Sequence, residues 1–192
     1  TSKTTTANIS KADLTATLND NSKIYDGTSY SGGNGITFNG FVNGETASLL
    51  NGTLNYSGTS QGAKDAGNYI ISGSGLTSNN YNISFVNGKL TINKKDLTIS
   101  NITANNKTYD GTTTATLSNI GSLVGLVTGE DLVLNNPTSV IFSSKDVGDG
   151  ITVTASGYTI ADKDSFKASN YNLTHTSKTT TANISKADLT AT

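Results

Sequence analysis

The chain has 192 residues with a formal net charge of −1, and it contains no cysteine, so it has no disulfide framework and no thiolate metal site. Its one histidine, His175, cannot form a multi-histidine zinc site, and its basic residues are all lysines nearly balanced by acidic ones. This argues against a nucleic-acid surface, which draws on clustered Lys and Arg, and no apolar run approaches the roughly 20 residues of a membrane span.

The predicted elements are short strands, because apolar residues alternate with polar ones. Residues 45–50 are the one helical candidate, about a single turn long. Asn87-Gly88 lies between two alternating runs and predicts a type I′ hairpin turn. One face of each strand should therefore lie on a core and the other in water. The alternating runs are, in chain order, Ile36 and Phe38; Leu54 and Tyr56; Tyr81, Ile83 and Phe85; Leu90 and Ile92; and Ile151 and Val153.

A perfect internal repeat organises the chain. Residues 1–17 and 176–192 both read TSKTTTANISKADLTAT, at an offset of 175 positions. Chance does not produce such a match, so we interpret the chain as one unit of a longer tandem array. Residues 1–9 are then expected to form the last strand of a preceding repeat, and residues 186–192 the start of the next one.

A second, weaker repeat lies inside this unit. The segment 22–28 returns as 106–112, the segment 40–45 as 125–130, and the segment 78–83 as 168–173. Because these landmarks recur in one order, the unit is predicted to hold two related β modules, residues 10–93 and 94–185.

Several short strands in each module predict an all-β fold, with two tandem small β-sandwich modules of immunoglobulin-like architecture. A β-grasp-like arrangement, with one short helix over a sheet, is the alternative. No Gly/Ser/Pro-rich linker separates the modules around residues 94–97. Such a short connection favours an extended, stiff array over a flexible one.

The landmarks resemble two bacterial surface repeats. Residues 107–112, with 145–148 and 169–173, resemble the YDG-type repeat, whereas residues 40–48 and 80–92, with Tyr25-Asp26-Gly27 and Gly67-Asn68-Tyr69, resemble the MBG (mostly-beta, glycine-rich) repeat. The resemblance implies a segment of a large secreted, filamentous-haemagglutinin-like adhesin linked to biofilms. It also implies an extracellular or cell-surface location, and it implies no catalytic residues.

The most specific candidate residues are predicted to be structural. In such a tripeptide Gly supplies an open backbone angle, Asp accepts hydrogen bonds from nearby amides, and Tyr buries its ring. We interpret the Tyr-Asp-Gly tripeptides as anchored turns for this reason, and we assign the Asn-Tyr landmarks to the same structural motif. The residues concerned are Tyr25, Asp26, Gly27, Tyr109, Asp110, Gly111, Asn80, Tyr81, Asn170 and Tyr171.

No metal or other cofactor is expected. Calcium, which needs six to eight oxygen ligands, is the alternative, and its best candidates are Asp146, Asp149, Asp162 and Asp164. None of these fits the EF-hand spacing. A hydrolase would have to use His175, and the chain has no Gly-x-Ser-x-Gly elbow and no phosphate-binding loop. We therefore expect no enzyme activity.

The sequence predicts a structural stalk or spacer unit of a giant adhesin, whose partners are the neighbouring repeats. In one alternative the repeat itself binds polysaccharide, host glycan or ice, with Tyr30, Tyr56, Tyr69 and Tyr158 as candidate sugar contacts. In another, copies of the chain associate through an unpaired edge strand. Residues 178–184, duplicated at 3–9, are the candidate edge.

Overall fold

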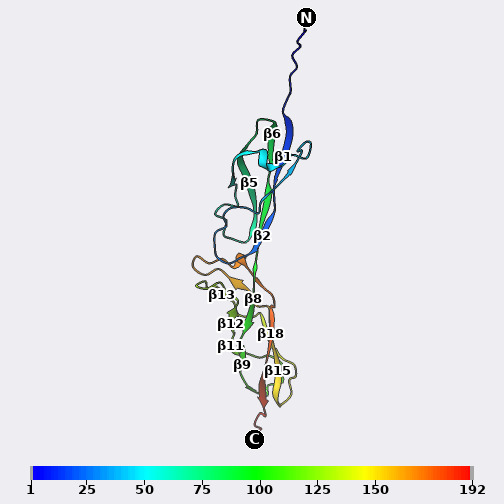
Figure 1. Ribbon diagram of the computed structural model, residues 1–192. Helices are drawn as coiled ribbons and strands as arrows, with labels where there is room; N and C mark the ends of the chain where they lie inside the picture. Colours follow the sequence, from blue (N-terminus) through cyan, green and yellow to red (C-terminus); the bar gives the residue numbers. More distant parts are fainter. Residues whose placement is uncertain (1, 191–192) are drawn as a thin grey trace. The chain divides into compact units, whose positions relative to one another are not determined.

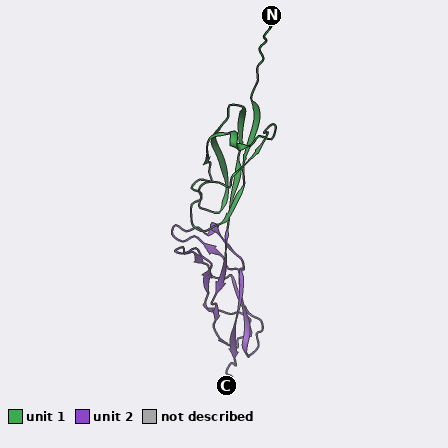
Figure 2. Cartoon of the chain, in the orientation of Figure 1, with its two compact units in different colours: residues 1–93 green, residues 94–192 purple. Residues whose placement is uncertain are grey.

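The computed structural model describes residues 2–190. The chain divides into two compact units, residues 1–93 and 94–192, which are coloured separately in Figure 2. Apart from two single 3-10 turns, all the regular elements of the described residues are β-strands (Figure 1). The predicted all-β fold class is thus confirmed.

Unit 1 contains seven strands and one helical turn. The turn η1 (Ala47–Leu49) confirms the single turn predicted within residues 45–50. It is too short to cover a sheet. The strands are β1 (Ala12–Leu18), β2 (Asn21–Ile24), β3 (Ile36–Asn39), β4 (Asn51–Ser57), β5 (Gly67–Thr77), β6 (Tyr81–Val86) and β7 (Gly88–Asn93).

These strands form two sheets, in the orders β3-β1-β6 and β2-β7-β5-β4. β6 pairs parallel to β1, and β7 pairs parallel to β2, whereas the remaining pairs are antiparallel. The two consecutive strands β1 and β2 therefore lie in different sheets, and so do β6 and β7. The segments β1–β2 and β6–β7 therefore run parallel to each other and cross together from the first sheet to the second.

This crossing makes the predicted hairpin at Asn87-Gly88 wrong, because β6 and β7 do not pair with each other. Gly88 is instead required by a close approach of two backbones. A Cβ at this position would lie 2.5 Å from the carbonyl oxygen of Leu18. The amide of Lys89 then donates a 2.7 Å hydrogen bond to the Asp20 carboxylate, which ties the two crossing segments together.

Unit 2 repeats this topology, and most of its strands are shorter than their equivalents in unit 1. Its two main sheets have the orders β12-β8-β17 and β10-β18-β15-β14, and β17·β8 and β10·β18 are the parallel pairs. Two small antiparallel pairs, β9·β11 and β13·β16, are added. The elements are β8 (Lys95–Ser100), β9 (Thr103–Ala104), β10 (Lys107–Thr108), β11 (Leu117–Asn119), β12 (Ser122–Val124), β13 (Val133–Leu134), β14 (Ser139–Phe142), β15 (Gly148–Ser156), β16 (Ile160–Ala161), η2 (Ala168–Asn170), β17 (Tyr171–Leu173) and β18 (Ser177–Ser185).

The cores follow from the alternation in the sequence. In unit 1 the inward positions of β1 and β7 are buried, among them Leu14, Leu90 and Ile92. In unit 2 one cluster forms around Phe142 and Ile184, and a second contains Ile99, Ala155 and Tyr158. Burial of such side chains supplies about 1.5–3 kcal/mol each relative to exposure, which offsets the ordering of the strands.

The duplicated segment has two environments. Residues 177–185 form β18, which pairs with β15 along most of its length and with β10 only at Ile184 and Ser185. Among the described strands, none pairs with the other edge of residues 178–183, so association of copies through this edge stays a prediction. The identical residues 2–10 form no strand and are exposed. Ile184 is 2% exposed, whereas its duplicate Ile9 is 99% exposed. Burial of this segment therefore depends on the strands that flank it, and not on its own sequence.

Candidate functional site

The Tyr-Asp-Gly tripeptides form the same turn in both units. In unit 1 Asp26 Oδ1 accepts hydrogen bonds from Lys23 Nζ (2.7 Å), the Thr28 amide (2.9 Å) and Thr28 Oγ1 (2.7 Å). Lys23 Nζ also donates to the Thr28 carbonyl oxygen, at 3.3 Å. Gly27, with φ +75°, provides the reversal that brings Thr28 back onto Asp26. We call this set the Lys-Asp-Thr clasp.

Unit 2 reproduces the clasp with Lys107, Asp110 and Thr112. Asp110 Oδ1 accepts from Lys107 Nζ (2.8 Å), the Thr112 amide (2.9 Å) and Thr112 Oγ1 (2.9 Å), and Gly111 has φ +77°. Lys107 Nζ also donates to the Thr114 carbonyl oxygen, at 3.0 Å. Its ammonium also lies 5.5 Å from the centre of the buried Phe142 ring. The clasp therefore attaches a loop to the core of its unit.

Both clasp carboxylates are strongly acidic. Partial burial by itself raises the pKa of Asp26, but hydrogen bonds from Lys23 and Thr28 outweigh it and lower that pKa to about 2. The hydrogen bond from Lys107, followed by those from Thr112, lowers the pKa of Asp110 to about 2 as well. Groups held ionised in this way are suited to anchoring a turn and unsuited to proton transfer near neutral pH.

The tyrosines of the two clasps differ in exposure. The backbone amide of each donates to the end of the last strand of its unit, Tyr25 to Asn93 O (2.8 Å) and Tyr109 to Ser185 O (2.9 Å). The Tyr25 side chain is 3% exposed, whereas the Tyr109 side chain is 39% exposed. The sequence predicted a buried ring at both positions, and the structure places only the Tyr25 ring in that state.

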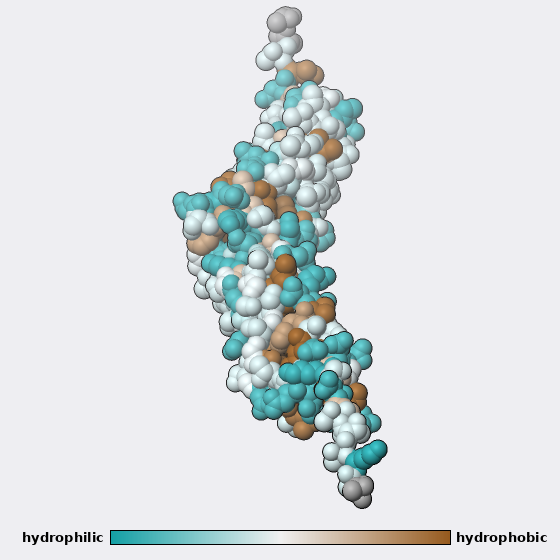
Figure 3. Space-filling view, turned by 90° about the horizontal axis from the view of Figure 1, so that it is seen from above, coloured by the Kyte–Doolittle hydropathy of each residue, from teal (hydrophilic) through white to brown (hydrophobic). Residues whose placement is uncertain are grey.

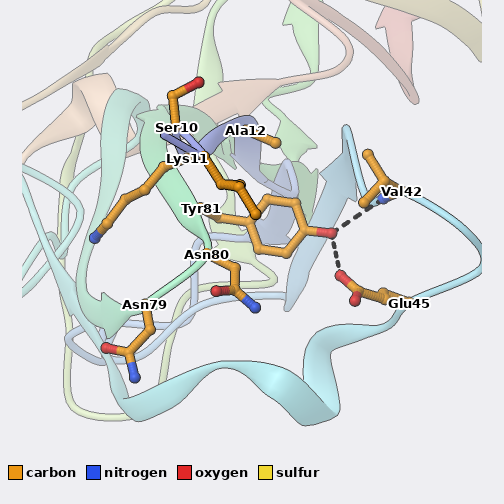
Figure 4. Close-up of a pocket in the computed structure, with 9 residues that line it drawn as sticks. Ser10, Lys11, Ala12, Val42, Glu45, Asn79, Asn80 and Tyr81 are labelled. Carbon is orange, nitrogen blue, oxygen red and sulfur yellow. Dashed lines mark hydrogen bonds between the residues drawn. The ribbon is translucent and has the colours of Figure 1, made fainter. Parts of the chain in front are cut away.

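The Asn-Tyr landmark is part of a second repeated contact, which we call the Tyr-Glu latch. Tyr81 in unit 1 donates its hydroxyl hydrogen to Glu45 and accepts from the Val42 amide at 3.1 Å (Figure 4). In unit 2 the Tyr171 hydroxyl donates to Glu130 at 2.7 Å and accepts from the Val127 amide at 3.1 Å. The latch joins the first residue of β6 to the loop after β3 in unit 1, and the first residue of β17 to the loop after β12 in unit 2.

The latch stabilises the neutral phenol. Burial, followed by the hydrogen bond to Glu130, raises the pKa of Tyr171 to about 12. The hydrogen bond to Glu45 raises the pKa of Tyr81. Neither tyrosine is thereby prepared to act as a base. The sequence analysis assigned no role to Glu45 and Glu130, although each is the last residue of a segment that recurs in the two modules, 40–45 and 125–130.

A third repeated contact crosses each parallel strand pair. Asn82 on β6 donates to Asp13 on β1 at 3.3 Å, and Asn172 on β17 donates to Asp96 on β8 at 2.8 Å. The two asparagines belong to the recurring segments 78–83 and 168–173, and the two aspartates each lie in a Lys-x-Asp-Leu tetrapeptide, residues 11–14 and 94–97. The structure therefore brings together landmarks that are 69 or 76 positions apart in the chain.

The remaining Asn-Tyr residues also lie at strand ends. Asn80 is exposed, and its carbonyl oxygen accepts from the Ala12 amide at 3.0 Å at the start of β1. Asn170 is buried at the end of η2, where its amide donates to Lys167 O at 3.1 Å. Both residues directly precede the strand that begins a parallel pair, β6 for Asn80 and β17 for Asn170.

A cavity of about 290 Å³ lies beside the Tyr81 latch (Figure 4). Ser10, Lys11 and Val42 contribute to its walls together with Tyr81 and Glu45. Lys11 Nζ donates to the Ser78 carbonyl oxygen at 2.9 Å, and Tyr81 and Glu45 bind each other. Its ionisable groups are thus engaged in contacts within unit 1.

The four calcium candidates do not form one site. Asp146 pairs with Lys145 at 2.9 Å, Asp149 lies on β15, and Asp162 accepts the Ala168 amide at 2.8 Å. Asp164 lies in the loop after β16 with a positive φ of 53°. Within residues 2–190, no group of three or more His, Asp or Glu side chains is arranged to hold a metal ion.

The candidate sugar-contacting tyrosines are engaged within the protein. Tyr158 is fully buried. The hydroxyls of Tyr30 and Tyr56 accept hydrogen bonds from Asn21 Nδ2 and the Gly35 amide, and that of Tyr69 donates to Asp65 O. The apolar areas visible in Figure 3 are separated by polar surface.

His175 lies on an exposed segment with its Nδ1 3.0 Å from Thr174 Oγ1. None of the helices in the described part of the chain is long and apolar enough to cross a membrane.

Two different family models match the two halves of the chain. Residues 14–91 match the family model of the MBG domain (YGX type), and residues 93–182 match that of the YDG domain. No curated protein matches the chain. The two matches follow each other along the chain, and each covers most of one compact unit.

Proposed function

Because the chain belongs to the MBG (YGX type) and YDG domain families, with one domain of each in tandem, we propose that it is a spacer repeat of a giant secreted adhesin. These domains are typical of repeats in adhesin-like surface proteins, and they are structural domains. The proposed role is mechanical: the repeats hold a distal binding region away from the cell surface for adhesion or biofilm formation.

The duplication of residues 1–17 at 176–192 is the observation that carries this proposal. Such a match is expected where whole units are added or lost, which changes the length of an array and leaves the fold of each unit intact. The internal contacts support the same role. The clasp, the latch and the Asn-Asp hydrogen bond across each parallel pair are formed by side chains that recur in both units. Each of these contacts holds loops and strands of one unit together.

Scattering from chains of one, two and three repeats tests the proposal. For a spacer, the maximum dimension should rise by a nearly constant increment per added repeat. A flexible string would instead grow roughly as the square root of repeat number, and a compact particle with an exponent of about 0.4. Compact scaling would refute the spacer role.

A binding measurement separates the spacer from an adhesive module. The labelled 192-residue chain should show no saturable binding to biofilm polysaccharide, mucin glycans or whole cells, with or without calcium. Saturable binding by the folded chain would mean that each repeat is adhesive, with array length acting through avidity.

A further inference from the structure

Each unit has a cavity that is lined by the same dipeptide of the duplicated segment. The 290 Å³ cavity of unit 1 is lined by Ile9 and Ser10, and a cavity of about 430 Å³ in unit 2 is lined by Ile184 and Ser185. Ile9-Ser10 and Ile184-Ser185 are the same dipeptide of the duplicated segment. Where another copy of residues 11–93 follows Ser185, the two cavities therefore lie on either side of a single Ile-Ser dipeptide.

Each of these surfaces presents an exposed apolar side chain beside the shared dipeptide. On the unit 1 side Val42 is 46% exposed and lines the cavity. On the unit 2 side Tyr109 is 39% exposed, and its amide is bonded to the carbonyl oxygen of Ser185 itself. At the equivalent position of unit 1 the Tyr25 ring is buried, so a tyrosine at this position of the motif can be covered by other residues.

The charges at the two surfaces do not oppose contact. The unit 1 cavity is lined by Lys11 and Glu45, and the unit 2 cavity by Lys107 and Asp149. Each wall thus carries one positive and one negative group. Exposed aromatic and aliphatic side chains with balanced charges around them are typical of the core and rim of a protein interface.

We propose that the end of unit 2 carrying Tyr109 docks on the end of unit 1 carrying Val42 in the following copy of the repeat. The occupant of this surface is the next repeat of the same chain. The inference rests on the proposed array and adds a mechanism to it, because a docked junction restricts bending between repeats whereas an undocked one acts as a hinge.

Tyrosine nitration by tetranitromethane tests the docking. The test chain extends the 192 residues by a second copy of residues 18–192, so that one Tyr109 lies at a junction and the other does not. Because docking covers one copy of the two, the nitrated fraction of Tyr109 should fall to about half of its value in the 192-residue chain. Tyr30 serves as the reference whose nitrated fraction stays constant, and the fully buried Tyr158 should stay unmodified in both chains.

A matched pair of variants identifies the surface. Val42→Lys in the second copy should restore the nitration of Tyr109 to the level of the 192-residue chain. Ile70→Lys in the second copy is the control, because Ile70 is 49% exposed and lies on β5, away from the cavity lining. It should leave the protection intact.

Two outcomes would overturn the docking. One is an equal nitrated fraction of Tyr109 in the one-repeat and two-repeat chains, and the other is protection that persists after Val42→Lys. Failure of the docking is distinguishable from failure of the spacer role. A reactive Tyr109 in an array whose scattering still grows with each repeat removes the docking alone.

Discussion

The duplicated segment provides a substitution and its control within one chain. Ile184 and Ile9 have the same 17-residue sequence context, and they differ in burial, at 2% and 99% exposed. Ile184→Ala should destabilise unit 2, whereas Ile9→Ala should leave both units unchanged. Since the local sequence is identical, effects on the unfolded chain are nearly the same and cancel in the comparison.

The size of the effect follows from what Ile184 contacts. The substitution removes three carbon atoms from a cluster that contains Phe142 and Val153, which at about 0.8 kcal/mol per carbon gives about 2.4 kcal/mol. Incomplete collapse of the cavity extends the expected loss to about 2–4 kcal/mol. In a domain of this size that corresponds to a Tm lower by roughly 10–25 °C. Ile9→Ala should change the free energy of unfolding by less than about 0.5 kcal/mol.

Hydrogen exchange measured by mass spectrometry at increasing urea concentration reads the two units separately. For Ile184→Ala the protection of β15 and β18 should be lost at lower urea, and the protection of β5 and β7 should stay unchanged. Should the variant fail to fold, Ile184→Val, with an expected loss of about 1 kcal/mol, replaces it. Equal losses for Ile9→Ala and Ile184→Ala would refute the assignment of residues 177–185 as the buried copy.

Three further outcomes are expected. Tyr158→Phe should leave the free energy of unfolding unchanged or raise it by up to about 1 kcal/mol, because within the described residues the buried hydroxyl has no hydrogen-bond partner; a lower Tm would contradict this. Urea midpoints should fall as the pH drops from about 4 to about 2, because the pKa values of Asp26 and Asp110 in the folded protein are about 2, below the ordinary 3.8. Their contribution to stability is therefore present above pH 4 and disappears as they are protonated. Replacing both with Asn should flatten this pH dependence. Gly40→Ala should lower the free energy of unfolding by about 2 kcal/mol or more, because φ is +117° and the new Cβ would lie 2.5 Å from a backbone oxygen. Gly62→Ala is the control, because its Cβ would meet open space at φ +82°, and it should lower the free energy of unfolding by less in the same urea titration.

Alternation in the sequence predicted the strands because burial at every second residue is a local property. Leu90 and Ile92 were placed on one face, and both are buried on β7. Strand pairing is a long-range property, which is why the hairpin at Asn87-Gly88 was wrong. An Asn-Gly dipeptide suits a type I′ turn, but here Gly is needed for the close approach of Leu18 O, a contact across some seventy positions that no local pattern contains.

The sequence identified the candidate residues, but it could not identify the residues that they contact. Recurrence in the two modules identified Tyr81 and Tyr171 as landmarks, but it could not reveal that each binds a glutamate 36 or 41 positions earlier. The recurrence of Glu45 and Glu130 at the end of an equivalent segment was the available signal. In each unit the latch joins two of the recurring segments, 40–45 with 78–83 and 125–130 with 168–173.

The two units share a topology but differ in sequence, and this difference affects strand exchange between neighbouring domains of an array. Identical neighbouring domains are prone to exchange strands during folding, because each strand fits its neighbour as well as its own domain. Here β7 and β18 occupy equivalent places in their sheets, yet they read GKLTIN and SKTTTANIS. Segments that are truly interchangeable, such as 2–10 and 177–185, are 175 positions apart and separated by a unit of the other type. Because the effective concentration of a tethered segment falls with linker length, alternation of the two domain types would disfavour exchange in the proposed array while keeping one architecture along it.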